Sequence, residues 1–150
     1  MTERPIPAVG AAIVDRGRLL LVKRAQDPNK GLWAIPGGKI HWGETMHVAV
    51  EREIREETGL DIEVGEAVWV GDIIGPSQPP EWHYCVIDFI AHTTGGVASA
   101  ASDVDELGWF TLEEARALPL TPTMPSLLDA LERFGSHLPP PTSHLPPPHA

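Results

Sequence analysis

Short apolar stretches alternate with one long, charged segment along the chain. Residues 9–14 and 19–23 are rich in branched apolar side chains and flank a short polar turn, which predicts a β-hairpin. Residues 83–92 form a nearly continuous apolar run, which is typical of a strand buried on both faces. Residues 45–58 contain neither glycine nor proline and precede Gly59, so they predict a helix with a glycine cap.

Weaker patterns fill the space between these elements. Residues 62–64 and 68–70 predict one interrupted strand, and three prolines predict a loop over residues 71–81. The other expected elements are a turn-rich link at 33–38, a strand at 106–110, a helix at 111–118 that opens with a capping box, and a helix at 125–134 that ends before Gly135. Together they predict a mixed β-sheet with helices on its faces, an α/β (α+β) sandwich.

The last residues differ in composition from the rest of the 150-residue chain. Residues 136–150 repeat the letters HLPPP, and a proline-rich segment of this kind favours an extended conformation outside a packed core. We therefore expect one domain over residues 1–135 and a disordered tail over residues 136–150. Two other roles stay open for the tail: a ligand for SH3- or WW-type domains, and metal binding by its histidines.

Composition and charge narrow the classes of function. The chain has 42% apolar and 21% charged residues, as globular proteins do, and no apolar run long enough to span a membrane. The net charge of −10 argues against a large nucleic-acid partner, which would need a basic surface. One cysteine, Cys85, excludes an internal disulfide, and the N-terminus does not resemble a secretory signal, so we expect a cytoplasmic protein.

The predicted helix at residues 45–58 places acids where apolar residues are expected. At 100° per residue, the carboxylates of Glu53, Glu56 and Glu57 share one face. The apolar residues, Met46 among them, fall on or beside that same face. The solvent side is left to Val48, Glu51, Arg52 and Arg55. An ordinary amphipathic helix keeps its acids away from the apolar stripe, because burying unpaired charge is unfavourable.

Two interpretations of this acidic face are open. A glutamate-rich helix is often only a solvated surface. Alternatively, a divalent cation satisfies the clustered oxygens, which suit hard ions such as Mg²⁺ or Mn²⁺. Gly37 and Gly38, just upstream, allow close approach of the backbone and expose carbonyl oxygens as further ligands. Glu44, at the helix entrance, is also explained as an acid that the helix dipole favours.

Residues 38–60, GKIHWGETMHVAVEREIREETGL, resemble the Nudix box of the MutT-related Nudix hydrolases. The box reads Gly, five residues, Glu, seven residues, then Arg-Glu-aliphatic-any-Glu-Glu-any-Gly-aliphatic. Every defined position matches: Gly38, Glu44, Arg52, Glu53, Ile54, Glu56, Glu57, Gly59 and Leu60. The resemblance covers roughly residues 6–133. His41 stands where relatives often have an acid, outside the defined positions.

The resemblance implies an α/β/α sandwich and an enzyme that hydrolyses a nucleoside diphosphate linked to another group. It implies a metal site for Mg²⁺ (or Mn²⁺) in which Glu53 and Glu57 are ligands. Glu56 and the carbonyl of Gly37 would complete or support that site, and Arg52 would hold the glutamates in place.

Further roles follow from the same resemblance and from the positions of individual residues. Gly38 would shape the loop before the helix. The identity of the general base stays open. Within the box, Glu56 or Glu53 is the first candidate and Glu44 the next. Outside the box the candidates are Asp103, Asp105 and Glu106, which a solvated acidic turn also explains. Arg24 is a candidate for binding phosphate, or a plain surface cation. Three aromatic residues could stack on a base or belong to the core: Trp33, Trp82 and Tyr84.

The substrate is less clearly specified than the reaction. Pro76 follows the box at an offset that resembles the ADP-ribose pyrophosphatase subgroup, and residues 83–91 look like its short bacterial relatives. ADP-ribose is therefore the first choice. The alternatives are a MutT-like triphosphatase acting on dNTPs or oxidised dGTP, and a non-catalytic nucleotide-binding module. Relatives are often dimers, so a homodimer also stays open.

Overall fold

The computed structural model describes residues 3–101 and 104–135. In chain order the elements are β1 (Ile6–Asp15), β2 (Arg18–Arg24), β3 (Trp33–Ala34), β4 (Gly37–Lys39), α1 (Met46–Thr58), β5 (Asp61–Ile74), β6 (His83–Gly95), β7 (Val104–Phe110), α2 (Leu112–Arg116) and α3 (Met124–Gly135). The predicted tail, residues 136–150, lies outside the described residues.

β1 is the central strand of a mixed sheet with the order β3-β2-β1-β6-β5. It runs parallel to β6, from the Ile6–Tyr84 pair to the Ile13–Ala91 pair. On its other side β1 pairs antiparallel first with the short β4 and then with β2. β7 pairs with β2. β1 therefore joins the two parts of the sheet and brings β4, which starts the Nudix-like box, into the middle of the molecule.

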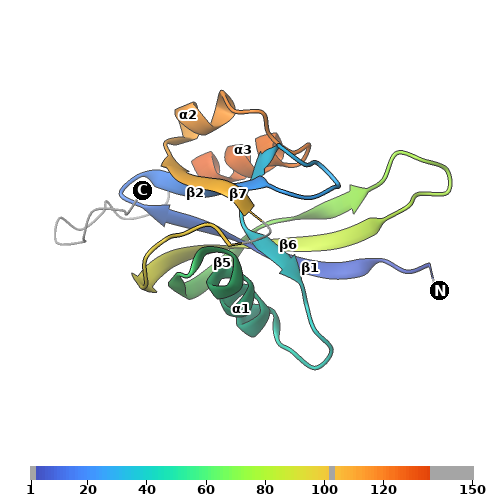
Figure 1. The fold of residues 1–150 in the computed structure, drawn as a ribbon, viewed down its shortest axis with the longest axis horizontal. Helices are drawn as coiled ribbons and strands as arrows, with labels where there is room; N and C mark the ends of the chain where they lie inside the picture. The colour runs from blue at the N-terminus through green and yellow to red at the C-terminus, as the bar shows by residue number, and fades with distance from the viewer. Residues whose placement is uncertain (1–2, 102–103, 136–150) are drawn as a thin grey trace.

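Helices cover both faces of these strands, as Figure 1 shows, with α1 on one side and α2 and α3 on the other. The α1 side buries Ala49, Val50 and Ile54 against β1 and β6. The α3 side buries Leu127 and Leu128, together with other apolar residues, against β2 and β3. This arrangement confirms the predicted mixed sheet and the α/β/α sandwich.

Several predicted boundaries were wrong, and pairing between strands explains most of them. The predicted loop at residues 71–81 is shorter, because β5 continues to Ile74 in register with β6, from the Gly71–Val86 pair to the Ile74–His83 pair. The link at residues 33–38 contains two short strands, which pair with β2 and β1. The last helix includes Gly135 instead of ending before it. The predicted interruption near residues 65–67 is confirmed as a register shift in β5.

The described residues, 3–101 and 104–135, contain no helix that is both long and apolar enough to cross a membrane.

Candidate active site

Local capping fixes the ends of α1, the helix that carries the acidic face. The side chain of Thr45 accepts a hydrogen bond from the backbone N–H of Val48 at 3.3 Å, which satisfies one unpaired donor of the first turn. Gly59 ends the helix with φ of 75°, a left-handed conformation that favours glycine. The predicted helix and its glycine cap are confirmed. Both ends are thus fixed, so the glutamates on the helix face a constant direction.

The backbone of β4 lies directly against the carboxylates of α1. A Cβ atom added at Gly38 would overlap the carboxylate of Glu53, so only glycine leaves that carboxylate its place. The N–H of Gly37 donates a hydrogen bond to Oε2 of Glu57 at 3.2 Å. Glu53 and Glu57, one helical turn apart, therefore each meet one of two neighbouring glycines of β4.

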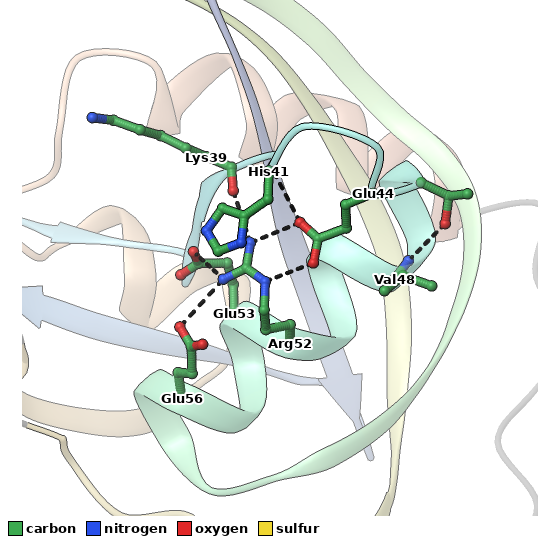
Figure 2. A network of polar contacts seen from close by, with 8 residues as sticks. Lys39, His41, Glu44, Val48, Arg52, Glu53 and Glu56 are labelled. Carbon is green, nitrogen blue, oxygen red and sulfur yellow. Dashed lines mark hydrogen bonds and ion pairs between the residues drawn. The ribbon is translucent and has the colours of Figure 1, made fainter.

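Arg52 is the centre of the polar network around these carboxylates (Figure 2). Its Nε and Nη2 bond both oxygens of Glu44, at 2.7 and 2.9 Å. Its Nη1 donates to Glu53 at 2.9 Å and to Glu56 at 3.3 Å. A further bond joins Nη2 to the carbonyl of Lys39 at 2.9 Å. All five guanidinium N–H groups are thereby used, and each helps to orient an oxygen of the site.

The same network corrects two predicted positions on the helix. Arg52 was expected on the solvent side, yet its side chain is only 21% exposed, because it reaches around the helix to the glutamates. Met46 was expected on the apolar face, yet it is 43% exposed at the first turn. Val48 and Arg55 do face solvent as expected.

Charge pairing in the network shifts the protonation of its members. The hydrogen bonds from Arg52, and then the bond from the backbone of His41, lower the pKa of Glu44 from 4.5 to about 2. The same Glu44 contact, more than that of Glu53, raises the pKa of Arg52. Both residues therefore stay charged at neutral pH.

A cavity of about 490 Å³ opens beside this network. Glu53, Glu57 and the two glycines of β4 form one end. The other walls come from the β2–β3 loop, the strands β5 and β6, and the start of α3. Its volume lies within the usual range for small-ligand sites. Glu56, whose side chain is 58% exposed, is not among the lining residues.

The substrate-binding residues predicted from sequence fall in different places. Arg24 lines the cavity; its Nε donates to the carbonyl of Pro28 at 2.8 Å, and the described residues give its Nη atoms no hydrogen-bond partner. Tyr84 also lines the cavity. Trp33 is 7% exposed and packs edge-on against Phe110 at 5.3 Å, which argues for the core and against stacking on a ligand.

The acids proposed outside the box stand apart from the cavity. Asp105 and Glu106 lie on β7 with exposed side chains and do not line it. Asp103 lies outside the described residues. Trp82 is also absent from the lining and lies close to Gly75 at the far end of the β5–β6 hairpin.

One lining residue was missed by the sequence analysis. Asp88, on β6, is 6% exposed and borders the same cavity. An acid in the middle of an apolar strand was a signal that could have drawn attention to it.

The residues at the charged end fit a divalent cation. Glu44, Glu53 and Glu56 bond one guanidinium, and Glu57 lies one helical turn from Glu53 and bonds Gly37, so four carboxylates and one guanidinium leave an excess of three negative charges. The donors are carboxylate and backbone oxygens, which hard cations such as Mg²⁺ and Mn²⁺ prefer over softer ions.

Known proteins are similar to this chain in fold and in sequence. The chain matches the NUDIX domain model over residues 4–131. The ADP-ribose pyrophosphatase of Methanocaldococcus jannaschii is 40% identical over 108 residues, which are 72% of this chain and 63% of that protein. The CTP pyrophosphohydrolase of Escherichia coli (strain K12) is 39% identical over 130 residues, 81% of this chain and 88% of that protein. The solved structure of a MutT NUDIX hydrolase from Burkholderia pseudomallei has a TM-score of 0.78 and 36% identity, and the match covers 86% of this chain and 99% of that one.

The chain therefore belongs to the Nudix hydrolase family. This confirms the family and the enzyme class that the residues 38–60 implied. The chain spans less than two thirds of the length of the Methanocaldococcus jannaschii relative, so that protein's activity is carried over only as a proposal.

Proposed function

We propose that the protein hydrolyses the pyrophosphate bond of a nucleoside diphosphate linked to another group, giving a nucleoside monophosphate and the phosphorylated remainder. ADP-ribose is the first-choice substrate. One observation carries the proposal: Glu53 and Glu57 meet the backbone of Gly37 and Gly38 at one end of a cavity of nucleotide size.

The proposed metal site consists of Glu53 and Glu57, with Glu56 and the Gly37 carbonyl completing or supporting it. Bound Mg²⁺ or Mn²⁺ would supply positive charge for the pyrophosphate oxygens and lower the pKa of the attacking water. The protein's own contribution is to hold these oxygens in fixed positions before substrate arrives.

Three groups of this chain have distinct tasks in that reaction. Arg52 positions the carboxylates of Glu44, Glu53 and Glu56 through four of its five N–H donors. Arg24 binds a phosphate of the substrate with the Nη atoms that have no partner among the described residues. Glu53 is the first choice for the general base, because it lines the cavity whereas the exposed Glu56 does not.

The substrate choice is supported by the names of the relatives. One is an ADP-ribose pyrophosphatase and another is a CTP pyrophosphohydrolase, at nearly equal identity. Nucleoside triphosphates, including dNTPs and oxidised dGTP, are therefore the second candidate class. The complete set of box glutamates argues against a non-catalytic nucleotide-binding module. A cytoplasmic location and a homodimer stay predictions from sequence.

A hydrolysis screen with Mg²⁺ and with Mn²⁺ tests the proposal. The panel contains ADP-ribose, other NDP-sugars, dinucleoside polyphosphates and the NTPs, and the products are identified by mass. AMP and ribose 5-phosphate from ADP-ribose are the expected products. Selective release of pyrophosphate from an NTP would move the protein to the second class, and silence across the panel would contradict the proposal.

A further inference from the structure

Asp88 is an acid in an unusual position. It lies on β6, beside the central strand, at the register position opposite Gly10 of β1. Its carboxylate lies so close to Gly10 that a Cβ atom added there would overlap Oδ1. Only 6% of the residue is exposed, and what is exposed borders the cavity described above.

The carboxylate of Asp88 has no hydrogen-bond or ion-pair partner among the described residues. Across residues 3–101 and 104–135, no hydrogen bond or ion pair reaches either of its oxygens. In the same part of the chain, no side-chain oxygen that is sealed from solvent lacks a partner. The oxygens of Asp88 are therefore unpaired but accessible, and the space they reach is the cavity.

An unpaired buried carboxylate is destabilising, since it loses hydration without gaining a hydrogen bond. Burial alone raises the pKa of Asp88 to about 7. A stability penalty without structural benefit is typical of residues kept for a ligand. The ligand group that relieves the penalty is a hydrogen-bond donor.

The rest of the cavity restricts what that donor belongs to. The pyrophosphate is assigned to the end with Glu53 and Glu57, and a phosphate next to Asp88 would meet a like charge. The cavity lining also includes the apolar residues Ile35, Val86, Met124 and Leu127, and Ile35 lies beside Gly10 as Asp88 does. An uncharged, partly apolar group that carries N–H or O–H donors fits this description, and the nucleoside of the substrate is such a group.

We infer that Asp88 is a substrate-positioning residue that accepts hydrogen bonds from N–H or O–H donors of the substrate's nucleoside. This inference rests on the proposed function for the assignment of the pyrophosphate end. It gives the cavity two kinds of polar group: oxygens that hold the reacting phosphates, and one acceptor that sets how the nucleoside lies between the walls.

Nucleoside monophosphates provide the test, because they carry the nucleoside but no pyrophosphate bond to hydrolyse. Calorimetry on the full chain measures binding of AMP, GMP, CMP and UMP to the wild type, to Asp88→Asn and to Asp72→Asn. Asp72 is the matched control, since it is an exposed acid on the neighbouring strand β5 and outside the cavity lining. Inorganic pyrophosphate is the probe without a nucleoside.

We expect Asp88→Asn to weaken the tightest monophosphate by about 10-fold or more, with pyrophosphate unchanged and Asp72→Asn like the wild type. The variant should stay folded and melt at a higher temperature, by about 5 °C. A loss limited to particular bases assigns the donor to the base. A loss that disappears with the 2′- or 3′-deoxy nucleotide assigns it to the ribose.

Three results would overturn the inference: unchanged binding in Asp88→Asn, an equal change for nucleotides and pyrophosphate, or a wild type that binds no monophosphate. None of these depends on hydrolysis. Failure of the proposed function would instead appear as silence in the substrate screen, so the two failures are distinguishable.

Discussion

Glu44, in the Arg52 network, and Asp88, in the cavity wall, are both largely covered by protein, but their pKa values shift in opposite directions. The side chain of Glu44, beside the helix α1, is 12% exposed, and Asp88 on β6 is 6% exposed. The pKa of Glu44 falls to about 2, chiefly because Arg52 donates two hydrogen bonds to it. The pKa of Asp88 rises to about 7, because burial acts alone. At Glu44 the hydrogen bonds outweigh desolvation, whereas at Asp88 desolvation has nothing to oppose it.

This contrast separates two kinds of functional acid. The carboxylates of Glu44, Glu53 and Glu56 already accept hydrogen bonds from Arg52, so their positions are fixed before any ligand arrives. Asp88 has no such support and depends on a ligand for its hydrogen bonds. Variants of the α1 carboxylates should therefore lose activity, whereas a variant of Asp88 should gain stability.

The largest effect is expected at the charged end of the cavity. Glu53→Gln and Glu57→Gln each remove a charge from the proposed metal site, so kcat should fall about a thousand-fold, or ~4 kcal/mol in the barrier. Circular dichroism should show an intact fold. Glu51→Gln, on the exposed side of the same helix, is the matched control and should keep wild-type turnover. Near-normal rates in both variants would exclude these two carboxylates as ligands.

A smaller loss of activity should follow when Arg52, which bonds the carboxylates, is replaced. Arg52→Lys keeps the positive charge but cannot reproduce five N–H bonds in one plane, so kcat/KM should fall about 10- to 100-fold. The apparent affinity for Mg²⁺ should weaken as well. Arg55→Lys is the control, because Arg55 is exposed and pairs only with Asp61 in the described structure. If titration with Mg²⁺ gave identical curves for Arg52→Lys and the wild type, Arg52 would not organise the site.

Substitution of Asp88 should instead raise the stability of the protein. The raised pKa means that the folded state binds the proton more tightly, so stability falls as pH rises from about 4 to about 7. Asp88→Asn removes the cost of burying an ionised carboxylate, but the new amide is itself a buried polar group and cancels part of the benefit. The free energy of unfolding should therefore rise by about 2 kcal/mol at pH 8. Urea unfolding should show a smaller gain at pH 5. Glu53, Glu57 and Tyr84 line the same cavity and are unchanged in the variant.

The stability that Glu44 contributes should depend on pH in the opposite direction, and this is the smallest of the expected effects. Its lowered pKa means that the stabilisation is complete above pH 4.5 and is lost as pH falls towards 2. The difference in unfolding free energy between the wild type and Glu44→Gln should therefore shrink between pH 6 and pH 2. A constant difference across this range would show that the carboxylate is not charged and paired with Arg52.

Local signals in the sequence were sufficient to predict α1 and the grouping of its glutamates on one face. The caps at Thr45 and Gly59 depend on neighbouring residues, and the box spacing specifies which glutamates share a face. The predicted capping box at Thr111 is confirmed in the same way, with both of its hydrogen bonds present. Such features require no knowledge of the rest of the fold.

Features that depend on distant parts of the chain could not be predicted. The length of β5 follows from its pairing with β6, which overrides the turn-forming residues after Gly71. The inward reach of Arg52 follows from the length of its side chain and from its hydrogen bonds to Glu44, which precedes α1. The role of Asp88 depends on the register between β6 and β1, which opens a cavity beside one residue of an apolar strand.

The parallel pairing of β1 with β6 has a consequence for biosynthesis. β1 leaves the ribosome first, but its partner β6 is translated only after α1 and β5. At a translation rate of about 5–20 residues per second, the apolar centre of β1 stays without its partner β6 for several seconds. Contacts of such long sequence separation also slow refolding. A nascent chain halted before β6 should thus be protease-sensitive throughout, including the complete Nudix box, although every residue of that box has already been made.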